Sequence, residues 1–215
     1  MNKNNEYIPA LGHAWLTPLY DPLLRWGMRE ETFKRDLIAR AQIGPGHRVL
    51  DLGCGTATLT LLVKQLHPES VVAGLDGDPK VLEIGEAKAA KAGVDITLDH
   101  GMAFQLPYPD NSFDRVLSSL VLHHLTREDK RRTLREALRV LRPGGGLYVA
   151  DFGKPRTPPG YLLAFVMRRL ERASDNIEGL LPEMFRQAGF DPVQETAHYM
   201  TIFGTLTLVE GHKPK

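Results

Sequence analysis

Short apolar runs rich in β-branched residues alternate along the chain with longer segments of helical period. The apolar runs have the length of buried strands, and the longer segments place apolar residues three and four positions apart, as in a helix that packs on one face. Strands that alternate with helices form a parallel sheet with crossover connections, so the pattern predicts an α/β fold. The predicted strands are 48–52, 71–76, 94–98, 113–119 and 147–151, and the helices between them are 58–67, 78–92 and 126–141.

The helix predicted at 126–141 has the clearest signals at both ends. Thr126 can cap its first turn, and the acidic Glu128 and Asp129 suit the positive end of the helix dipole. The run 143–146, Pro-Gly-Gly-Gly, is predicted to end the helix before the next strand. The basic residues of this helix are predicted to form a solvated surface rather than a phosphate site. They are Lys130, Arg131, Arg132, Arg135 and Arg139.

A different pattern follows the fifth strand. A proline-rich break at 153–160 precedes an apolar segment at 161–173, which is predicted to be a lid-like helix, and another helix is predicted at 181–188. The last two apolar runs, 190–196 and 201–209, are too close together for a crossover helix, so they are predicted to be antiparallel. Together, the predicted strands form a seven-stranded, mostly parallel sheet with an antiparallel C-terminal strand.

Composition limits the function classes without naming one. The chain has 215 residues, of which 42% are hydrophobic and 25% charged, values typical of a single globular domain with a sizeable core. Its 27 basic and 26 acidic residues give a net charge of +1. No overall positive field therefore favours DNA or RNA, and no nucleic-acid partner is expected.

The single cysteine, Cys54, excludes an internal disulfide and is typical of a reduced compartment. The N-terminal residues are polar and lack the apolar core of a signal peptide. No window reaches the roughly 18 apolar residues that a spanning helix needs. We therefore expect a soluble, cytoplasmic protein without a membrane span.

A glycine-containing loop follows the first predicted strand, at the carboxyl edge where parallel sheets bind small molecules. Gly53 and Gly55 allow the backbone to turn sharply and a ligand to approach its amides. Asp51 ends the same strand; its carboxylate would repel a pyrophosphate but suits an ammonium group. Asp76 ends the next strand, where a carboxylate can accept both hydroxyls of a ribose. An amino acid head and a ribose in one ligand indicate S-adenosylmethionine.

Five segments in this order resemble the class I S-adenosylmethionine-dependent methyltransferases, particularly the small-molecule branch that includes the ubiquinone/menaquinone C-methyltransferases. The resemblance implies a Rossmann-like three-layer sandwich and a monomer or homodimer. It also implies S-adenosylmethionine as cofactor and S-adenosylhomocysteine as product. The matching segments are Val49–Thr58, Gly74–Asp76, Gly101–Asp114, Leu122–Leu125 and Leu141–Gly145.

The resemblance also implies the roles of individual residues. The glycine loop backs the methionine part of the cofactor, Asp76 holds the ribose, and Ser118 faces the amino acid part. Met102 lies along the adenine, where the family often has an aspartate that accepts from the adenine amino group. The third glycine of the loop is replaced by Ala57, a small residue that should still pack closely. The expected cofactor-binding residues are Tyr20, Asp51, Gly53, Gly55, Thr56, Asp76, Gly77, Met102, Ala103, Ser118 and His123.

Methyl transfer from a sulfonium is an in-line displacement in which the protein aligns the nucleophile and excludes water. A general base is needed only if the acceptor still carries a proton. His123, after the fourth strand, and Tyr20, in the tryptophan-containing N-terminal segment, are the candidate catalytic residues. Either could instead be a packing residue. Asp151, at the end of the fifth strand, points toward the pocket or only satisfies loop amides. No ligand spacing predicts a metal site.

The whole chain, 1–215, is predicted to form one methyltransferase domain. It would comprise an N-terminal helical cover at 1–47, a cofactor-binding core at 48–152, a lid and helices at 153–189 and closing strands at 190–215. The apolar flanks on both sides of the core are expected to shape a pocket for a small acceptor, which would be hydrophobic or aromatic.

Three alternatives stay open. A nicotinamide-dependent oxidoreductase could share the sheet, although Asp51 before the loop and the segment 141–145 argue against it. A regulatory protein could bind the cofactor without turnover, because Met102 departs from the family pattern and no pair of residues is an evident base. An RNA methyltransferase could use a local basic patch despite the near-neutral net charge.

Overall fold

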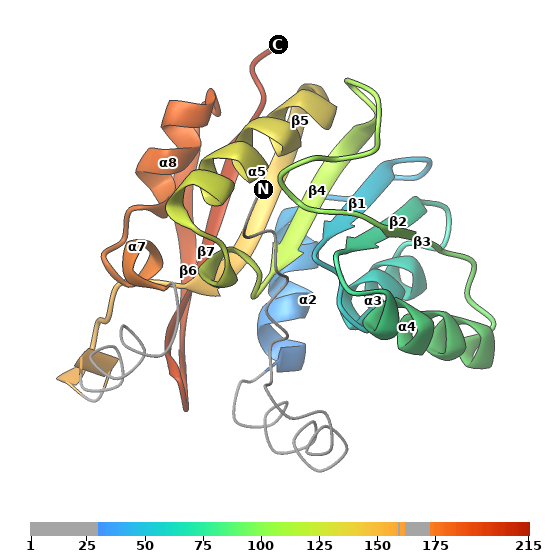
Figure 1. The fold of residues 1–215 in the computed structure, drawn as a ribbon, viewed down its shortest axis with the longest axis horizontal. Coiled ribbons are helices and arrows are strands. Elements are labelled where there is room, and N and C mark those ends of the chain that lie inside the picture. The colour runs from blue at the N-terminus through green and yellow to red at the C-terminus, as the bar shows by residue number, and fades with distance from the viewer. Residues whose placement is uncertain (1–29, 159, 162–172) are drawn as a thin grey trace, which may run out of the picture.

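A computed structural model shows one seven-stranded sheet with helices on both faces (Figure 1). The structure describes residues 30–158, 160–161 and 173–215. The strands are β1 (Arg48–Leu52), β2 (Val71–Asp76), β3 (Thr97–His100), β4 (Phe113–Ser119), β5 (Leu141–Phe152), β6 (Val193–Thr201) and β7 (Gly204–His212). The helices are α2 (Glu30–Arg40), α3 (Thr58–Leu66), α4 (Pro79–Ala92), α5 (Arg127–Val140), α7 (Ser174–Ile177) and α8 (Leu181–Ala188), with a short 3-10 helix, η2 (Leu122–His124).

The strand order across the sheet is β3-β2-β1-β4-β5-β7-β6. Strands β1 to β5 run parallel, and β7 pairs antiparallel with both β5 and β6. This confirms the predicted sheet of seven mostly parallel strands with an antiparallel C-terminal strand. The strand order reverses between β1 and β4, and open α/β sheets bind their ligands at the carboxyl ends of strands at such a reversal.

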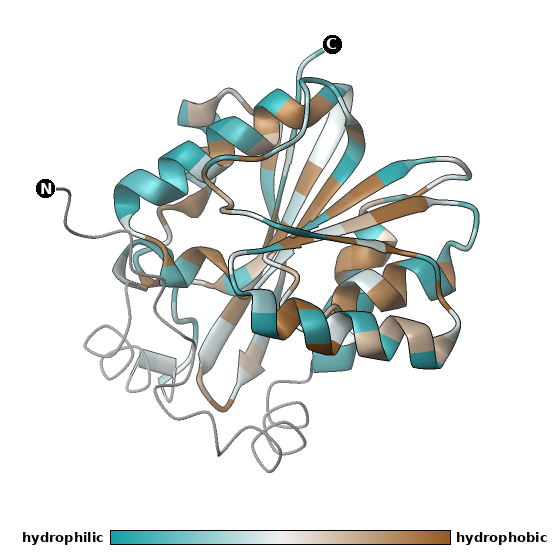
Figure 2. Cartoon of the chain, turned by 45° about the vertical axis from the view of Figure 1, so that its right-hand side comes forward, coloured by the Kyte–Doolittle hydropathy of each residue, from teal (hydrophilic) through white to brown (hydrophobic). Residues whose placement is uncertain are grey.

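Successive strand residues point to opposite faces, so the sheet supports two apolar layers. Helices α5 and α8 pack on one face, where Leu134 and Phe185 contact the same cluster as Val149 of β5. Helices α2 and α3 pack on the other face, where Phe33 joins Leu117 of β4. In Figure 2 the strands are largely apolar, whereas much of α5 is hydrophilic. The sheet, with helices packed on both of its faces, forms a three-layer sandwich.

The glycine run 143–146, expected to separate a helix from a strand, lies inside β5. Helix α5 ends at Val140, and the strand begins at the next residue. Gly144 donates to the carbonyl of Lys213, and Lys213 donates to the carbonyl of Gly145. Pairing with the distant chain end therefore stabilises a glycine run as a strand, and local turn propensity does not decide its conformation.

Three other strands lie later in the chain than their apolar runs predict. Val94 and Ile96 pack against a small cluster that contains Ala57, and the ring of Phe190 packs on that of Phe185 at a centroid distance of 5.3 Å. These apolar residues fill the core without joining a strand. The observed strands are 97–100 where 94–98 was predicted, 193–201 where 190–196 was predicted, and 204–212 where 201–209 was predicted.

The prediction that the basic residues of α5 form a solvated surface is wrong for Lys130. Its side chain is fully buried, and its Nζ lies 3.4 Å from Oδ2 of Asp175 in α7. Asp175 also pairs with Arg127 at the start of α5. The prediction holds for Arg131 and Arg135, which are exposed. Helix α7 covers the first turns of α5, and its position could not be known from the spacing of charges along one helix.

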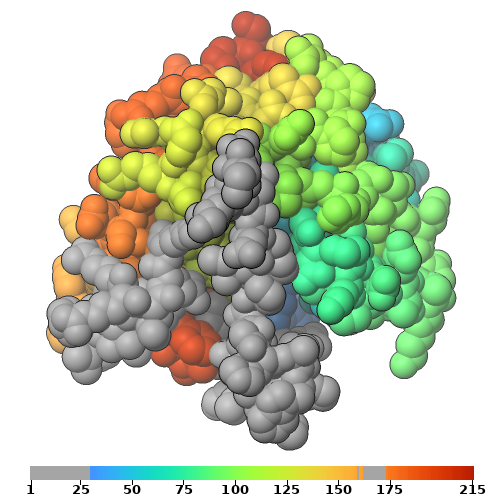
Figure 3. Space-filling view, viewed as in Figure 1, coloured from blue at the N-terminus to red at the C-terminus, as the bar shows by residue number. Residues whose placement is uncertain are grey.

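Arg139 also has a structural role. Its guanidinium donates to the carbonyl of Tyr108 at 2.8 Å and pairs with Glu136 at 2.8 Å. Glu136 in turn accepts from the amide of Leu106 at 2.8 Å. These contacts hold the segment between β3 and β4 beside α5, and Figure 3 shows the two surfaces side by side.

We expect Asp175→Asn to lower the free energy of unfolding by about 3 kcal/mol, because it removes a counter-charge from the buried ammonium of Lys130. Urea unfolding of both proteins measures the difference. Glu128→Gln is the matched control, since Glu128 forms an exposed ion pair with Arg135 that should contribute less than about 1 kcal/mol. Equal stabilities of the two variants would contradict this interpretation.

Candidate active site

The loop between β1 and α3 has a backbone conformation that favours glycine. Gly53 and Gly55 have φ angles of 73° and 53°, in the left-handed region. An added Cβ at Gly53 would lie 2.4 Å from Cγ2 of Val121, whereas an added Cβ at Gly55 would meet nothing within 4 Å. Gly53 is therefore required for close packing, and Gly55 borders open space that a ligand can occupy.

Ala57 stands at the third small position of the loop. It is fully buried, and its φ is 59°, which is strained for a residue with a side chain. Its methyl group is accommodated by Gly85 of α4, because an added Cβ at Gly85 would lie only 3.0 Å from it. The prediction that this residue packs closely is confirmed, and a second glycine, on another helix, provides the space.

Asp76 at the end of β2 holds the loop in place. Its Oδ2 accepts from the amide of Gly55 at 2.8 Å, and its Oδ1 accepts from the amide of Asp78 at 2.9 Å. The carbonyl of Gly77, between the two acids, lies 3.1 Å from Nε2 of His100. The predicted neighbours Gly55, Asp76 and Gly77 are thus brought together at one edge of the sheet.

Asp51 at the end of β1 is a buried carboxyl group. Thr60 donates its hydroxyl to Oδ2 at 2.7 Å. Burial raises the pKa of Asp51 to about 6, although the Thr60 hydrogen bond and the charge of Lys34 act in the opposite direction. A cationic ligand beside Asp51 would favour its ionised form. Burial likewise raises the pKa of Cys54, so the thiol stays protonated and the predicted packing role holds.

The other predicted cofactor residues lie near this edge in different environments. The hydroxyl of Thr56 accepts from a lysine of α4 at 2.6 Å. Met102 and Ala103 are half-buried in the segment after β3. Ser118 is buried and donates its hydroxyl to the carbonyl of Leu52 at 2.9 Å, so it links β4 to β1.

His123 lies in η2, directly after β4, and only 4% of it is exposed. Its Nδ1–H donates to Oδ1 of Asp151 at 2.8 Å. Oδ2 of Asp151 accepts from the amides of Leu122 and His123, and Oδ1 accepts from the amide of Phe152. Burial raises the pKa of Asp151, but His123, the amide hydrogen bond from Phe152 and the nearby His124 together outweigh it and hold the pKa below its ordinary value. Asp151 therefore both satisfies loop amides and orients a histidine.

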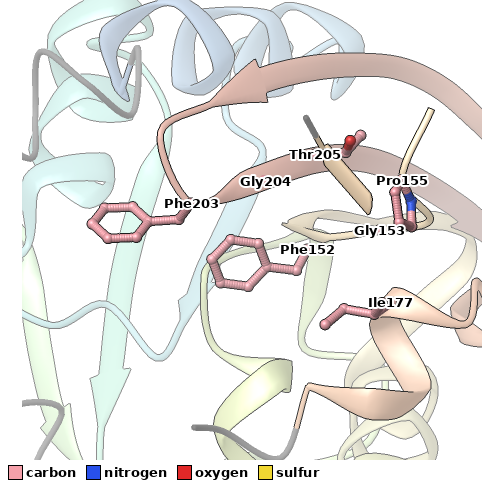
Figure 4. Close-up of a pocket in the computed structure, with 8 residues that line it drawn as sticks. Phe152, Gly153, Pro155, Ile177, Phe203, Gly204 and Thr205 are labelled. Carbon is pink, nitrogen blue, oxygen red and sulfur yellow. The ribbon is translucent and has the colours of Figure 1, made fainter. Parts of the chain in front are cut away.

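A small, mainly apolar cavity lies at the end of β5 (Figure 4). Phe152 forms one wall, and its ring packs edge-on against that of His123 with the centroids 4.8 Å apart. Ile177 of α7 and Phe203 of the β6–β7 turn line the same space. The sequence pattern did not predict these residues, because only the fold brings the end of β5, α7 and the hairpin together. The lining residues are Phe152, Gly153, Pro155, Gly160, Ile177, Phe203, Gly204 and Thr205.

Tyr20, predicted to bind the cofactor and to be a candidate catalytic residue, lies outside the described residues, as does most of the helix expected at 161–173. The cover expected at 1–47 is described only from Glu30 onward. Within residues 30–158, 160–161 and 173–215, no three His, Cys, Asp or Glu side chains are grouped to hold a metal ion. In the same part of the chain, no helix combines the length and the apolar character needed to cross a membrane.

Comparison with known proteins identifies the family. The sequence profile described as Methyltransferase domain matches residues 49–145. The demethylmenaquinone methyltransferase of Anoxybacillus flavithermus is 31% identical over 210 residues, which cover 86% of each chain. The chain belongs to the class I S-adenosylmethionine-dependent methyltransferases. A second relative, the demethylmenaquinone methyltransferase of Symbiobacterium thermophilum, is 32% identical over 85% of this methyltransferase and 82% of its own length.

The fold of this methyltransferase also matches a solved structure. Phosphoethanolamine N-methyltransferase 2 of Haemonchus contortus, in complex with S-adenosyl-L-methionine, superposes with a TM-score of 0.70. The match covers 86% of this chain and 53% of the other, at 17% identity. This similarity concerns the fold alone. Membership of the methyltransferase family, together with this fold, removes the oxidoreductase alternative.

We expect Gly55→Ala to weaken S-adenosylmethionine binding at least about tenfold, because the new methyl group enters the open space beside the loop amides. The left-handed backbone should cost about 1 kcal/mol of stability. Gly46→Ala is the matched control: Gly46 has a φ of 73° and open space, but it precedes β1 at the opposite edge of the sheet. Isothermal titration calorimetry should show unchanged affinity in the control and reduced affinity in Gly55→Ala.

We also expect S-adenosylmethionine affinity to fall as the pH is lowered through about 6, because protonated Asp51 cannot pair with the ammonium group of the methionine part. The loss should approach tenfold per pH unit below the pKa. Thr60→Val should move the midpoint to higher pH, since the Thr60 hydroxyl lowers the pKa of Asp51. Calorimetry from pH 8 to pH 5 tests both statements, and a flat profile in the wild type contradicts them.

Asp51 has the opposite effect on the pH dependence of stability: lowering the pH favours the folded, ligand-free protein. The folded-state pKa of Asp51 lies above the unfolded value of about 3.9, so its contribution is fully present below about pH 4. That contribution is lost as the pH rises through about 6. In the ligand-free protein, Asp51→Asn should remove this part of the pH dependence of urea unfolding.

Proposed function

We propose that this methyltransferase transfers a methyl group from S-adenosylmethionine to a small aromatic acceptor that carries a hydroxyl group, with His123 as general base. The observation that carries the proposal is the buried pair of His123 and Asp151, 2.8 Å apart. Both lie at the carboxyl edge of the sheet: Asp151 is near the end of β5, and His123 lies in η2, which follows the neighbouring strand β4.

The glycine loop and its two acids fit S-adenosylmethionine. Open space beside Gly55 leaves room for the methionine part, buried Asp51 can pair with its ammonium group, and Asp76 can accept from the ribose hydroxyls. The proposed adenine contact is the segment at Met102 and Ala103. When bound, the cofactor supplies an electrophilic methyl group on a positively charged sulfur.

The imidazole of His123 is oriented to receive a proton. Its Nδ1–H is held by Asp151, and in this tautomer Nε2 carries the lone pair that can accept a proton. When an acceptor takes the methyl group, with the methyl–sulfur bond broken and S-adenosylhomocysteine as the leaving group, Nε2 would accept the proton of the acceptor's hydroxyl. The negative charge of Asp151 stabilises the imidazolium, which later releases that proton to water. Loss of the hydroxyl proton makes either the oxygen or a ring carbon beside it the nucleophile.

The names of the two bacterial relatives, both demethylmenaquinone methyltransferases, point to a quinone-related ring system. Demethylmenaquinol with a short side chain is therefore the first acceptor to test. Incubation with cofactor carrying an isotopically labelled methyl group should give one labelled methyl per quinol by mass spectrometry. Absence of labelled product with this quinol and with cell-extract metabolites would contradict the proposed function.

His123→Gln should lower kcat at least about 100-fold while the affinity for S-adenosylmethionine changes less than about 3-fold, because the base acts on the acceptor. His124→Gln is the matched control. His124 is the exposed neighbour, and its ring lies 3.9 Å from that of His123 between centroids. Steady-state kinetics and calorimetry separate the two effects. Equal loss of activity in both variants would show that packing of η2, rather than proton transfer, explains the result.

A further inference from the structure

Helix α2 brings a buried ammonium group to the face of the sheet on which Asp51 lies. Only 8% of Lys34 is exposed. The residue before it, Phe33, packs in the same apolar cluster as Val49 of β1 and Leu59 of α3. Because alternate residues of a strand share a face, Asp51 points to the same side of the sheet as Val49. Lys34 and Asp51 therefore lie in the one layer that α2 and α3 form.

The charges of Lys34 and Asp51 are close together, but the two side chains do not bond to each other. The charge of Lys34 lowers the pKa of Asp51, as a nearby positive charge does. Asp51 accepts from the hydroxyl of Thr60, and Lys34 donates to Oε1 of Glu30, one turn earlier in α2. An ammonium group has three N–H donors and a carboxylate has two acceptor oxygens. Each group therefore has capacity for a further partner.

Two opposite charges in this arrangement suit a zwitterion. The amino acid end of S-adenosylmethionine carries its ammonium and its carboxylate on one carbon atom, so its site needs a negative and a positive group near each other. Asp51 is the proposed partner of the ammonium. The carboxylate loses its hydration in a buried site, and a positive partner with N–H donors is needed to replace it. Lys34 is a buried group of this kind beside Asp51.

We propose that Lys34 binds the carboxylate of the methionine part of S-adenosylmethionine, while Asp51 binds the ammonium on the same carbon atom. This inference rests on the proposed function and adds a residue of α2 to the cofactor site. Nζ–H of Lys34 donates to a carboxylate oxygen of the ligand. Helix α2, which precedes the glycine loop in the chain, then contributes directly to cofactor recognition.

Two ligands that differ by one carboxylate test the pairing. They are S-adenosylhomocysteine and its decarboxylated analogue, which keeps the ammonium group. The full chain is titrated with each by calorimetry at pH 8, where Asp51 is ionised. Lys34→Met should weaken binding of S-adenosylhomocysteine at least about 10-fold and change binding of the analogue less than about 3-fold. Lys34→Gln, which is neutral but polar, should show the same selective loss.

Arg35→Met is the matched control. Arg35, the next residue of α2, forms the same type of ion pair with Glu31, four positions earlier, but 51% of its side chain is exposed. The control removes one positive charge from the same helix without touching the buried layer, so both ligand affinities should stay unchanged. Urea unfolding of each variant shows that the titrated protein is folded.

Three results would overturn the inference. They are no binding of S-adenosylhomocysteine by the wild type, unchanged affinity for it in Lys34→Met, and equal weakening of both ligands by the substitution. The last would show that Lys34 acts only through Asp51 or through packing. Failure of the proposed function is distinguishable from these. In that case no acceptor is methylated, while S-adenosylhomocysteine still binds and its carboxylate still depends on Lys34.

Discussion

The buried carboxylate of Asp151 is the group on which the active edge of the sheet depends. It lies at the end of β5, accepts from the amides of Leu122, His123 and Phe152, and binds the imidazole of His123. A buried carboxylate is tolerated only with such partners, because its lost hydration must be replaced. The crossover after β4 must therefore keep its backbone close to the end of β5. One interaction thus positions both the loop and the proposed base.

The cavity depends on a second buried charge, farther from the sheet. Asp175 ties the four-residue helix α7 to Lys130 and Arg127 of α5. Two residues later, Ile177 of the same short helix lines the cavity. A helix of this length has little stability of its own, so ionic contacts to α5 hold this wall of the cavity in place. The position of this cavity wall and the packing of α5 are consequently coupled.

The glycine loop was more predictable than the acceptor side, and the reason is local. The conformations of Gly53 and Gly55 and the position of Asp76 follow from a strand, a tight turn and a helix that are adjacent in the sequence. Even here one feature is non-local, since Ala57 fits its strained position only because Gly85 of α4 leaves space. The small residue is evident in the sequence, but its partner on α4 is revealed only by the fold.

The sequence by itself determined the α/β class, the ranges of β1, β2 and β4, and the position of the glycine loop beside Asp51 and Asp76. These features depend on periodicity and on neighbours a few positions away, both of which are present in the sequence itself. The tertiary structure alone decided that His123 pairs with Asp151, that the run 143–146 forms a strand, and that Thr205 meets Phe152 in one cavity. Each of these brings together segments far apart in the chain. Their free energy comes from long-range pairing and burial, which local propensity does not contain.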